Sequence, residues 1–250
     1  MAELPLDKPA GVLVKTTCVD FPGRLAGSFF LKGCNIRCPY CYNIGLVLED
    51  AENPEPLSTV AELFAHLEKR QGILSGLVIS GGEPLLNPYT PLIIKKARQL
   101  GYKIKIDTNG TLPEKLRALI ENPELRPDFI AMDIKTTPAR YATLICGNKS
   151  PFFNKSDYFE KVLGESAELV ASYPADCREW RTVLVPGLVT KDDIAEMAKL
   201  LPQDASWQFA QFMNKNCLDP AYNEIYPYTD KEVTELVDYA KKLIEGSNLR

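Results

Sequence analysis

Six short apolar segments alternate with amphipathic helical segments along this chain, and this alternation limits the possible folds more than any other feature. The apolar segments have the length of strands and most end at turn residues. They cover residues 28–32, 77–80, 103–107, 128–134, 180–185 and 206–212. Strands that alternate with helices favour a parallel sheet wound in right-handed units. We therefore expect an α/β fold, a partial (β/α)6 TIM-like barrel with an open lateral side.

The segments between the strands carry helix-start signals. Four of them begin with a threonine that is followed three residues later by an acidic residue, the pattern of a capping box. These pairs are Thr59/Glu62, Thr111/Glu114, Thr190/Asp193 and Thr229/Glu232. We expect further helices over 91–100 and 158–172, and a loop with a short helix over 136–155. The pattern indicates one domain over 1–250, with an N-terminal extension over 1–27 and a C-terminal loop and helix over 213–250.

Length and composition exclude several classes of protein. A chain of 250 residues with 45% hydrophobic content can bury a full core. The net charge of -4 has no polycationic character, so nucleic acid is not an expected partner. No apolar run approaches the roughly 20 residues of a membrane span, and no basic region precedes an apolar one at the start. We therefore expect a cytoplasmic protein that does not contact membranes.

Seven cysteines in such a chain indicate metal binding or catalysis rather than a disulfide framework. Cys34, Cys38 and Cys41 lie together after the first expected strand, with spacings of four and three residues. Three thiolates leave a ligand position open, as in a catalytic metal site or in an iron–sulfur cluster with one available iron. A zinc knuckle with a distant fourth ligand and unconnected thiols are the alternatives. We expect ordinary buried or half-buried thiols at the remaining positions, Cys18, Cys146, Cys177 and Cys217.

Polar motifs follow the other expected strands at their carboxyl ends. Gly81-Gly82-Glu83 comes after the second strand, Asp107 ends the third, and Asp133 and Lys135 close the fourth. In parallel β/α folds the loops at these ends converge on the functional site. Each motif also has a structural interpretation of its own, as a strand-to-helix turn, a surface turn residue or a salt bridge. Their common placement nevertheless predicts one site.

The C-x-x-x-C-x-x-C run, with Tyr40 before its last cysteine, resembles the signature of radical S-adenosylmethionine enzymes. Together with the upstream segment 19–23 (Val-Asp-Phe-Pro-Gly), it most resembles the activating enzymes of glycyl-radical enzymes, and among those the activating proteins of anaerobic ribonucleotide reductase. The resemblance implies that Cys34, Cys38 and Cys41 bind a 4Fe-4S cluster whose fourth iron binds S-adenosylmethionine.

The same resemblance implies a reaction and its partners. Reductive cleavage of S-adenosylmethionine yields methionine and a 5′-deoxyadenosyl radical, which takes a hydrogen atom from a glycine of the partner enzyme. The electron comes from a flavodoxin or ferredoxin. By the same resemblance, the segment at Gly81 meets the ammonium group of the cofactor, Arg181 contacts it, and Tyr40 packs near the adenine. Asp107, Asp133 and Lys135 approach its carboxylate, its ribose or a monovalent cation. The implied cofactor-binding residues are Tyr40, Gly81, Gly82, Glu83, Asp107, Asp133, Lys135 and Arg181.

Several features of the sequence depart from the pattern of this family or lie outside its motifs. Gly81 follows Cys41 by only 40 residues, which leaves no room for the ferredoxin-like cluster of longer activating enzymes. The family's histidine after strand six is missing, and only Gln211 and Met213 are available there. Lys103 and Lys105 give the third strand a cationic face, which suggests a basic rim for a partner protein. We expect the one histidine, His66, at the surface or its boundary.

Three other functions stay open from the sequence. The first is a radical enzyme of the same family that acts on a small molecule such as a deazapurine precursor. The second is an activating enzyme for pyruvate formate-lyase. The third is a zinc-binding interaction domain without catalysis.

Overall fold

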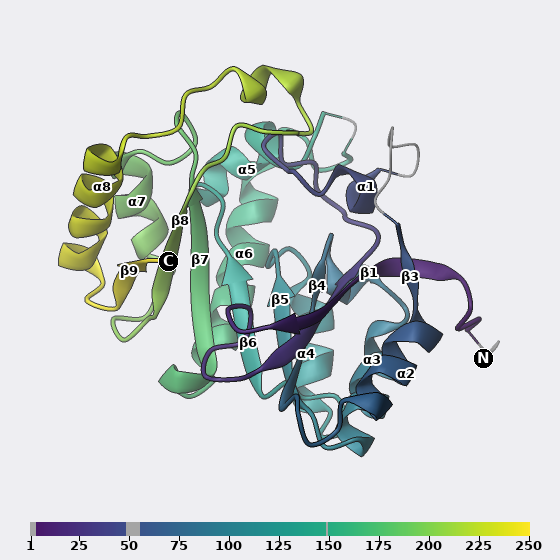
Figure 1. Cartoon of the computed structure of the whole chain (residues 1–250). Helices are drawn as coiled ribbons and strands as arrows, with labels where there is room; N and C mark the ends of the chain where they lie inside the picture. Colours follow the sequence, from purple (N-terminus) through teal and green to yellow (C-terminus); the bar gives the residue numbers. More distant parts are fainter. Residues whose placement is uncertain (1–3, 49–55, 149) are drawn as a thin grey trace. The chain divides into compact units, whose positions relative to one another are not determined.

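The computed structural model of the protein describes residues 4–48, 56–148 and 150–250 (Figure 1). The chain divides into two compact units that are interleaved in the sequence. The first unit comprises Met1–Asn35, Asn43–Thr108 and Glu114–Ile130. The second comprises Ile36–Tyr42, Asn109–Pro113 and Ala131–Arg250.

The sheet of the first unit contains four strands that run in one direction and one strand that runs antiparallel to them. Its strands are β1 (Pro9–Thr17), β2 (Ala26–Leu31), β3 (Ser58–Thr59), β4 (Gly76–Gly81) and β5 (Lys103–Thr108). They lie in the order β3-β1-β2-β4-β5. Strands β2, β4 and β5 are parallel neighbours, whereas β1 runs antiparallel to both β2 and β3. The N-terminal extension therefore contributes a full strand to the sheet.

Helices of the first unit follow the local signals of the sequence. They are α1 (Ile44–Val47), α2 (Val60–Lys69), α3 (Thr90–Gln99) and α4 (Pro113–Glu121), with the short 3-10 helix η1 (Pro84–Leu86). Helix α2 begins with the predicted capping box of Thr59 and Glu62, and its buried residues Val60, Leu63 and Leu67 recur on one face. Helix α4 begins at Pro113, two residues after Thr111, the predicted cap.

The second unit repeats the alternation of strands and helices. Its strands are β6 (Phe129–Asp133), β7 (Arg178–Leu184), β8 (Trp207–Gln211) and β9 (Ser247–Leu249). Its helices are α5 (Pro138–Leu144), α6 (Ser156–Ala171), α7 (Lys191–Ala198) and α8 (Asp230–Leu243), with η2 (Ala175–Cys177) and η3 (Pro220–Asn223). Strand β6 starts in the first unit and ends in the second. The order is β6-β7-β8-β9, and β7, β8 and β9 are parallel.

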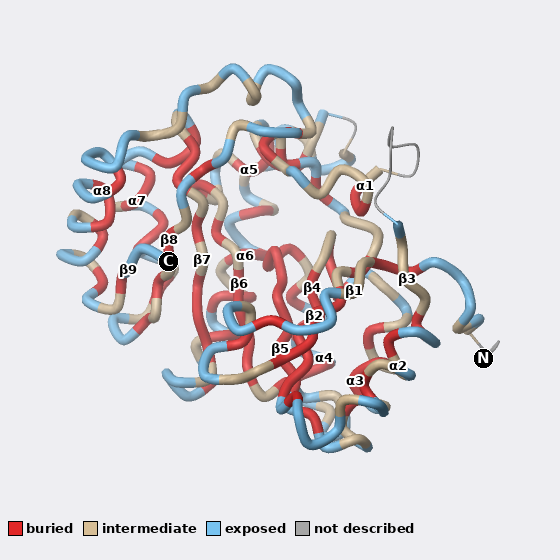
Figure 2. Tube along the Cα trace, viewed as in Figure 1, coloured by how far each residue is buried: buried red, intermediate tan, exposed pale blue. Residues whose placement is uncertain are grey.

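The predicted fold class is confirmed, because the sheet is mostly parallel and is not closed. The strand order of the first unit begins with β3, and that of the second unit ends with β9. The strands are largely buried, whereas the helices expose one side (Figure 2). Trp180 and Trp207 pair across β7 and β8, and both are fully buried. In the part of the chain that the structure describes, no helix combines the length and apolar character that crossing a bilayer requires.

Helix α7 begins with a capping box that is also an ion pair. The backbone N–H of Thr190 donates to Asp193 Oδ2 at 2.9 Å, and Arg140 Nη1 donates to Asp193 Oδ1 at 2.6 Å. Burial by itself raises the pKa of the Asp193 carboxyl, but the hydrogen bonds from Arg140 and Thr190 outweigh burial and lower it below its ordinary value. The ionised form of Asp193 therefore stabilises the folded state.

We expect Asp193→Ala to lower the free energy of unfolding by about 2 kcal/mol at pH 7, since it removes a cap and leaves Arg140 without this partner. Because the folded-state pKa is lowered, this contribution is present above the ordinary carboxyl pKa and is lost as pH falls through the folded value. The difference from wild type in urea unfolding should therefore shrink below about pH 4. The exposed neighbour Asp192 is the control, and an equal loss in Asp192→Ala would contradict the assignment.

Candidate active site

The three motif cysteines lie on the loop between β2 and α1. The chain leaves the first unit after Asn35 and returns to it at Asn43, so Cys34 belongs to the first unit and Cys38 and Cys41 to the second. Cys38 is buried, and the other two are partly exposed. Among the described residues, no three His, Cys, Asp or Glu side chains already form a metal site. The assignment of these three thiols as a ligand set therefore stays a prediction from the sequence.

In the first unit, the glycine segment after β4 is hydrogen-bonded to the start of the cysteine loop. The backbone N–H of Gly82 donates to Leu31 O at 2.9 Å, and that of Glu83 donates to Gly33 O at 2.8 Å. A Cβ atom at Gly82 would lie 2.1 Å from Gly33 O and 3.1 Å from the Cβ of Cys34. Gly81 adopts a φ of 122°, which L side chains rarely adopt. Both glycines are therefore required where β4 meets the cysteine loop.

Glu83 is fully buried and holds neighbouring elements together. Its carboxylate accepts from the N–H of Leu85 at 3.1 Å, which caps η1, and from Thr108 Oγ1 at 3.0 Å. The hydrogen bond to Thr108 joins the carboxyl ends of β4 and β5, as the sequence predicts for motifs that converge. The described contacts of Glu83 thus position the two strand ends.

Lys105 corrects one interpretation of the sequence. The alternation of lysines in β5 suggested a basic rim, but the Lys105 side chain is fully buried. Its Nζ lies 2.9 Å from Asp107 Oδ1 and donates to Asp20 O at 2.7 Å, and it sits over the Phe129 ring at 5.6 Å. A buried ammonium needs such partners because it has lost its hydration. Asp107, a predicted site residue, is therefore paired with Lys105.

In the second unit, Asp133 lies between two cations. Arg181 Nε donates to Asp133 Oδ1 at 2.8 Å, and Lys135 Nζ donates to Asp133 Oδ2 at 3.1 Å. The exposed fractions of the Asp133, Arg181 and Lys135 side chains are 30%, 20% and 16%, respectively. The structure thus brings together three predicted site residues, from β6, the loop after it and β7. The group carries one net positive charge beside accessible surface.

Tyr40 and Tyr141 are close enough to Lys135 to interact with it electrostatically. Burial raises the pKa of the Tyr40 phenol well above its usual value, although the nearby Lys135 opposes this shift. Burial by itself lowers the pKa of Lys135, but Asp133 and the neighbouring Tyr40 and Cys38 raise it well above its usual value. Tyr141 accepts the backbone N–H of Lys135 at 2.8 Å. Sequence analysis missed Tyr141, because the helix α5 that carries it has no motif of its own.

Tyr40 also makes an edge-on contact with Phe212, with ring centroids 6.5 Å apart. Its hydroxyl is buried and has no hydrogen-bond partner among the residues that the structure describes. An unpaired buried hydroxyl is costly and is typical of a position that a ligand or water completes. This observation fits the predicted role of Tyr40 next to a bound cofactor.

A second feature that sequence analysis missed is the anchoring of the cysteine loop by the C-terminal loop. The backbone N–H groups of Leu218 and Asp219 donate to Cys41 O and Pro39 O, each at 2.9 Å. Nearby, where the sequence lacks a histidine, Gln211 Nε2 donates to Tyr228 O at 2.9 Å and Met213 is 63% exposed. The hydrogen bonds from Leu218 and Asp219 to the cysteine loop join residues almost 180 positions apart, so no local signal could have indicated them.

The remaining single residues mostly agree with expectation. Cys146 and Cys217 are buried and Cys177 is half-buried, as predicted, whereas Cys18 is exposed. His66 is half-buried and its Nε2 bonds to Lys15 O at 2.8 Å, which confirms a boundary position.

Comparison with known proteins places this arrangement in a family. The Radical SAM superfamily model matches residues 28–201. A protein of Methanocaldococcus jannaschii with the name "Putative glycyl-radical enzyme activating enzyme MJ1227" is 29% identical over 245 residues, which are 95% of this chain and 94% of that protein. A 7-carboxy-7-deazaguanine synthase of Methanopyrus kandleri is 28% identical over 132 residues, which are 46% of this chain and 51% of the synthase.

The crystal structure of QueE from Escherichia coli superposes with a TM-score of 0.51 at 15% identity, covering 98% of this chain and 92% of QueE. At this identity the likeness is one of fold, and it confirms the predicted α/β class. The matching superfamily model covers well over half of the chain, and it includes all three motif cysteines and every polar motif of the candidate site. This chain therefore belongs to the radical SAM superfamily.

Proposed function

We propose that this protein is an activating enzyme that cleaves S-adenosylmethionine reductively and generates a glycyl radical on a partner enzyme. The observation that carries the proposal is the match to a relative named for this activity, which extends over 95% of this chain and 94% of the relative. The matched deazaguanine synthase aligns over only 46% of the chain.

Membership of the superfamily implies a 4Fe-4S cluster and S-adenosylmethionine. In our proposal Cys34, Cys38 and Cys41 bind a single cluster, and the spacing and thiol chemistry of these residues fit it. When bound, the cluster supplies the electron that cleaves the sulfonium. The chain contributes a buried Cys38 close enough to Lys135 for the two groups to interact electrostatically.

The remaining site residues would bind and orient S-adenosylmethionine. Arg181 and Lys135 carry two positive charges against the one negative charge of Asp133. This group can therefore bind the carboxylate of the cofactor. Gly81 and Gly82 leave the backbone after β4 without side chains, where the ammonium group would bind. Tyr40 offers an aromatic face and an unsatisfied hydroxyl.

The two predicted aspartates take different parts in this proposal. Asp107 already has the Lys105 ammonium at 2.9 Å, which supplies a positive charge there. Asp133 already has two cationic partners, Lys135 and Arg181, so we do not expect the monovalent cation implied by the resemblance to bind at either carboxylate. Glu83 acts as a positioning residue through its bonds at the ends of β4 and β5.

We infer that the partner is anaerobic ribonucleotide reductase, with pyruvate formate-lyase as the second candidate, and that a flavodoxin or ferredoxin provides the electron in the cytoplasm. This inference is supported by the local resemblance of the cysteine loop and the upstream segment 19–23. A direct measurement of the glycyl radical on each candidate enzyme decides which of them is the partner.

The test is anaerobic incubation of the reduced holoenzyme and S-adenosylmethionine with each candidate partner, followed by paramagnetic resonance. We expect an organic radical on ribonucleotide reductase that is absent when the target glycine of the partner is replaced by alanine. Efficient cleavage of S-adenosylmethionine without a radical on any glycyl-radical enzyme would contradict the proposal.

A second candidate function is the modification of a small molecule such as a deazapurine precursor. It is favoured by the sequence match to the 7-carboxy-7-deazaguanine synthase, which is 28% identical over 46% of this chain. Mass spectrometry of anaerobic reactions with such a precursor distinguishes the two functions, because only this second one yields a modified small-molecule product.

The cluster ligands are tested with Cys38→Ala. We expect formation of 5′-deoxyadenosine to fall by at least about a hundredfold, because one of only three protein ligands is lost. The control is Cys18→Ala, which removes an exposed thiol and should retain the activity. Metal analysis of the wild-type protein should give iron and acid-labile sulfide; one zinc without sulfide would instead select the non-catalytic zinc domain.

Gly82→Ala tests whether the cysteine loop depends on the close approach of the backbone at Gly82 to Gly33. Its Cβ would lie 2.1 Å from Gly33 O, so we expect a loss of about 2 kcal/mol in unfolding free energy and a reduced iron content per chain. The matched control is Gly164→Ala in α6, where a Cβ meets nothing within 4 Å. That variant should raise the unfolding free energy by about 0.5–1 kcal/mol. Equal iron content in both variants would show that iron binding does not depend on the absence of a side chain at Gly82.

A further inference from the structure

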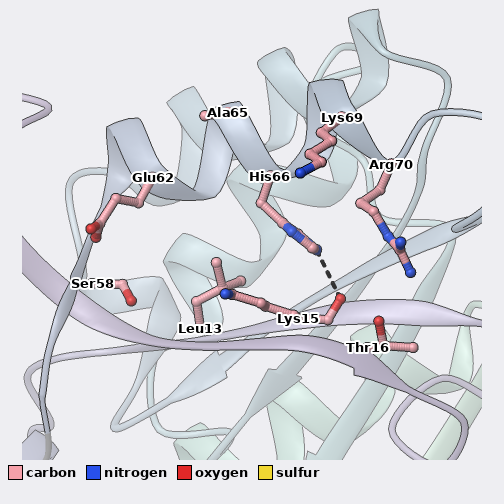
Figure 3. Close-up of a pocket in the computed structure, with 9 residues that line it drawn as sticks. All are labelled: Leu13, Lys15, Thr16, Ser58, Glu62, Ala65, His66, Lys69 and Arg70. Atoms are coloured by element: carbon pink, nitrogen blue, oxygen red, sulfur yellow. Dashed lines mark hydrogen bonds between the residues drawn. The ribbon is translucent and has the colours of Figure 1, made fainter.

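A pocket of about 660 Å³ lies between helix α2 and strand β1 in the first unit (Figure 3). It contains none of the proposed active-site residues. Its polar lining includes Lys15 and Thr16 from β1, and His66, Lys69 and Arg70 from the last part of α2 and the residue after it. Figure 3 shows His66 and Arg70 directed from α2 toward β1, with the bond from His66 to Lys15 O.

The three cations of this pocket differ from other basic residues of the first unit. Lys95, Lys96 and Lys103 each pair with a carboxylate within 2.8 Å. Within the described part of the chain, Lys15, Lys69 and Arg70 form no ion pair. This contrast leaves an uncompensated positive charge in a concave part of the surface.

The one acidic residue of the pocket does not neutralise these cations. Glu62 lies near the start of α2, and its carboxylate accepts the backbone N–H of Thr59 at 2.7 Å in the capping box. Lys69 is seven residues further along the same helix, about two turns away. The cations that line the pocket are therefore Lys15 from β1 and Lys69 and Arg70 from the end of α2, and Glu62 pairs with none of them.

Helix stability explains only part of this arrangement. Basic residues in the last turn of a helix interact favourably with its dipole, which accounts for Lys69 and Arg70. It does not account for Lys15, which comes from a different element.

We propose that this α2–β1 pocket binds a small molecule that carries two or more linked phosphate groups. Three cations from two elements match the charge of such a group, and an arginine guanidinium suits phosphate oxygens. The hydroxyls of Thr16 and Ser58 add donors along the same pocket. The volume lies in the range of small-molecule sites, which is larger than a single phosphate needs.

The test is isothermal titration calorimetry of the anaerobic holoprotein with pyrophosphate, ADP, inorganic phosphate and adenosine. We expect pyrophosphate and ADP to bind with one site per chain, and adenosine not to bind. The double variant Lys15→Gln/Lys69→Gln changes only exposed side chains and should weaken ADP binding by at least about tenfold. The single variant Lys115→Gln is the control, because Lys115 is exposed on α4 and outside the pocket.

The outcomes separate the possible ligands. Tighter binding of ADP than of pyrophosphate supports the proposal and identifies a nucleoside diphosphate, and equal binding supports a simple diphosphate ligand. Equal weakening in Lys115→Gln, unchanged ADP binding in the double variant, or no binding of any phosphate compound overturns it. Binding of a polyglutamate peptide without binding of phosphate compounds also overturns it. The result does not depend on which radical reaction the enzyme catalyses, because binding is measured without turnover.

Discussion

The candidate site depends on the backbone hydrogen bonds that join the end of β4 to the start of the cysteine loop. In the parallel pair of β2 and β4, Leu31 lies opposite Gly81. The bonding then continues beyond the strands, from Gly82 to Leu31 and from Glu83 to Gly33. A shift of this register by one residue would turn every side chain of β4 to the other face. The position of Cys34 is therefore a consequence of strand pairing, and the absence of side chains at 81 and 82 makes the close approach possible.

A second constraint is that charges close to the site occur in groups that contain both signs. Lys105 is fully buried and is paired with Asp107, while Asp133 is placed between Arg181 and Lys135. A single buried charge would be strongly unfavourable, and removing one partner of such a group would leave the other uncompensated. These residues therefore depend on each other for burial. Their side chains are held in place before any ligand binds, which lowers the entropy cost of orienting one.

The sequence predicted what depends on local signals and missed what depends on distant partners. Capping boxes at Thr59, Thr190 and Thr229 were correct, because each is complete within four residues. Burial of Lys105 could not be predicted, since one of its acceptors, Asp20 O, lies 85 residues earlier. The same reason applies to β1, whose length is set by pairing with β2. The candidate site residues came from strand-end placement and family resemblance, whereas their contacts required the structure.

The pKa values of Tyr40, Tyr141 and Lys135 limit the kind of chemistry that this part of the chain can support. The pKa values of Tyr40 and Tyr141 are raised above the usual 10.0 by burial, and that of Lys135 is raised above the usual 10.5 in spite of it. General acid–base catalysis works best with a pKa close to the working pH, and all three groups have moved further from neutrality. They act as fixed dipoles and a fixed positive charge. Such surroundings suit a reaction in which the cofactor supplies the reactivity and the protein supplies binding, orientation and electrostatics.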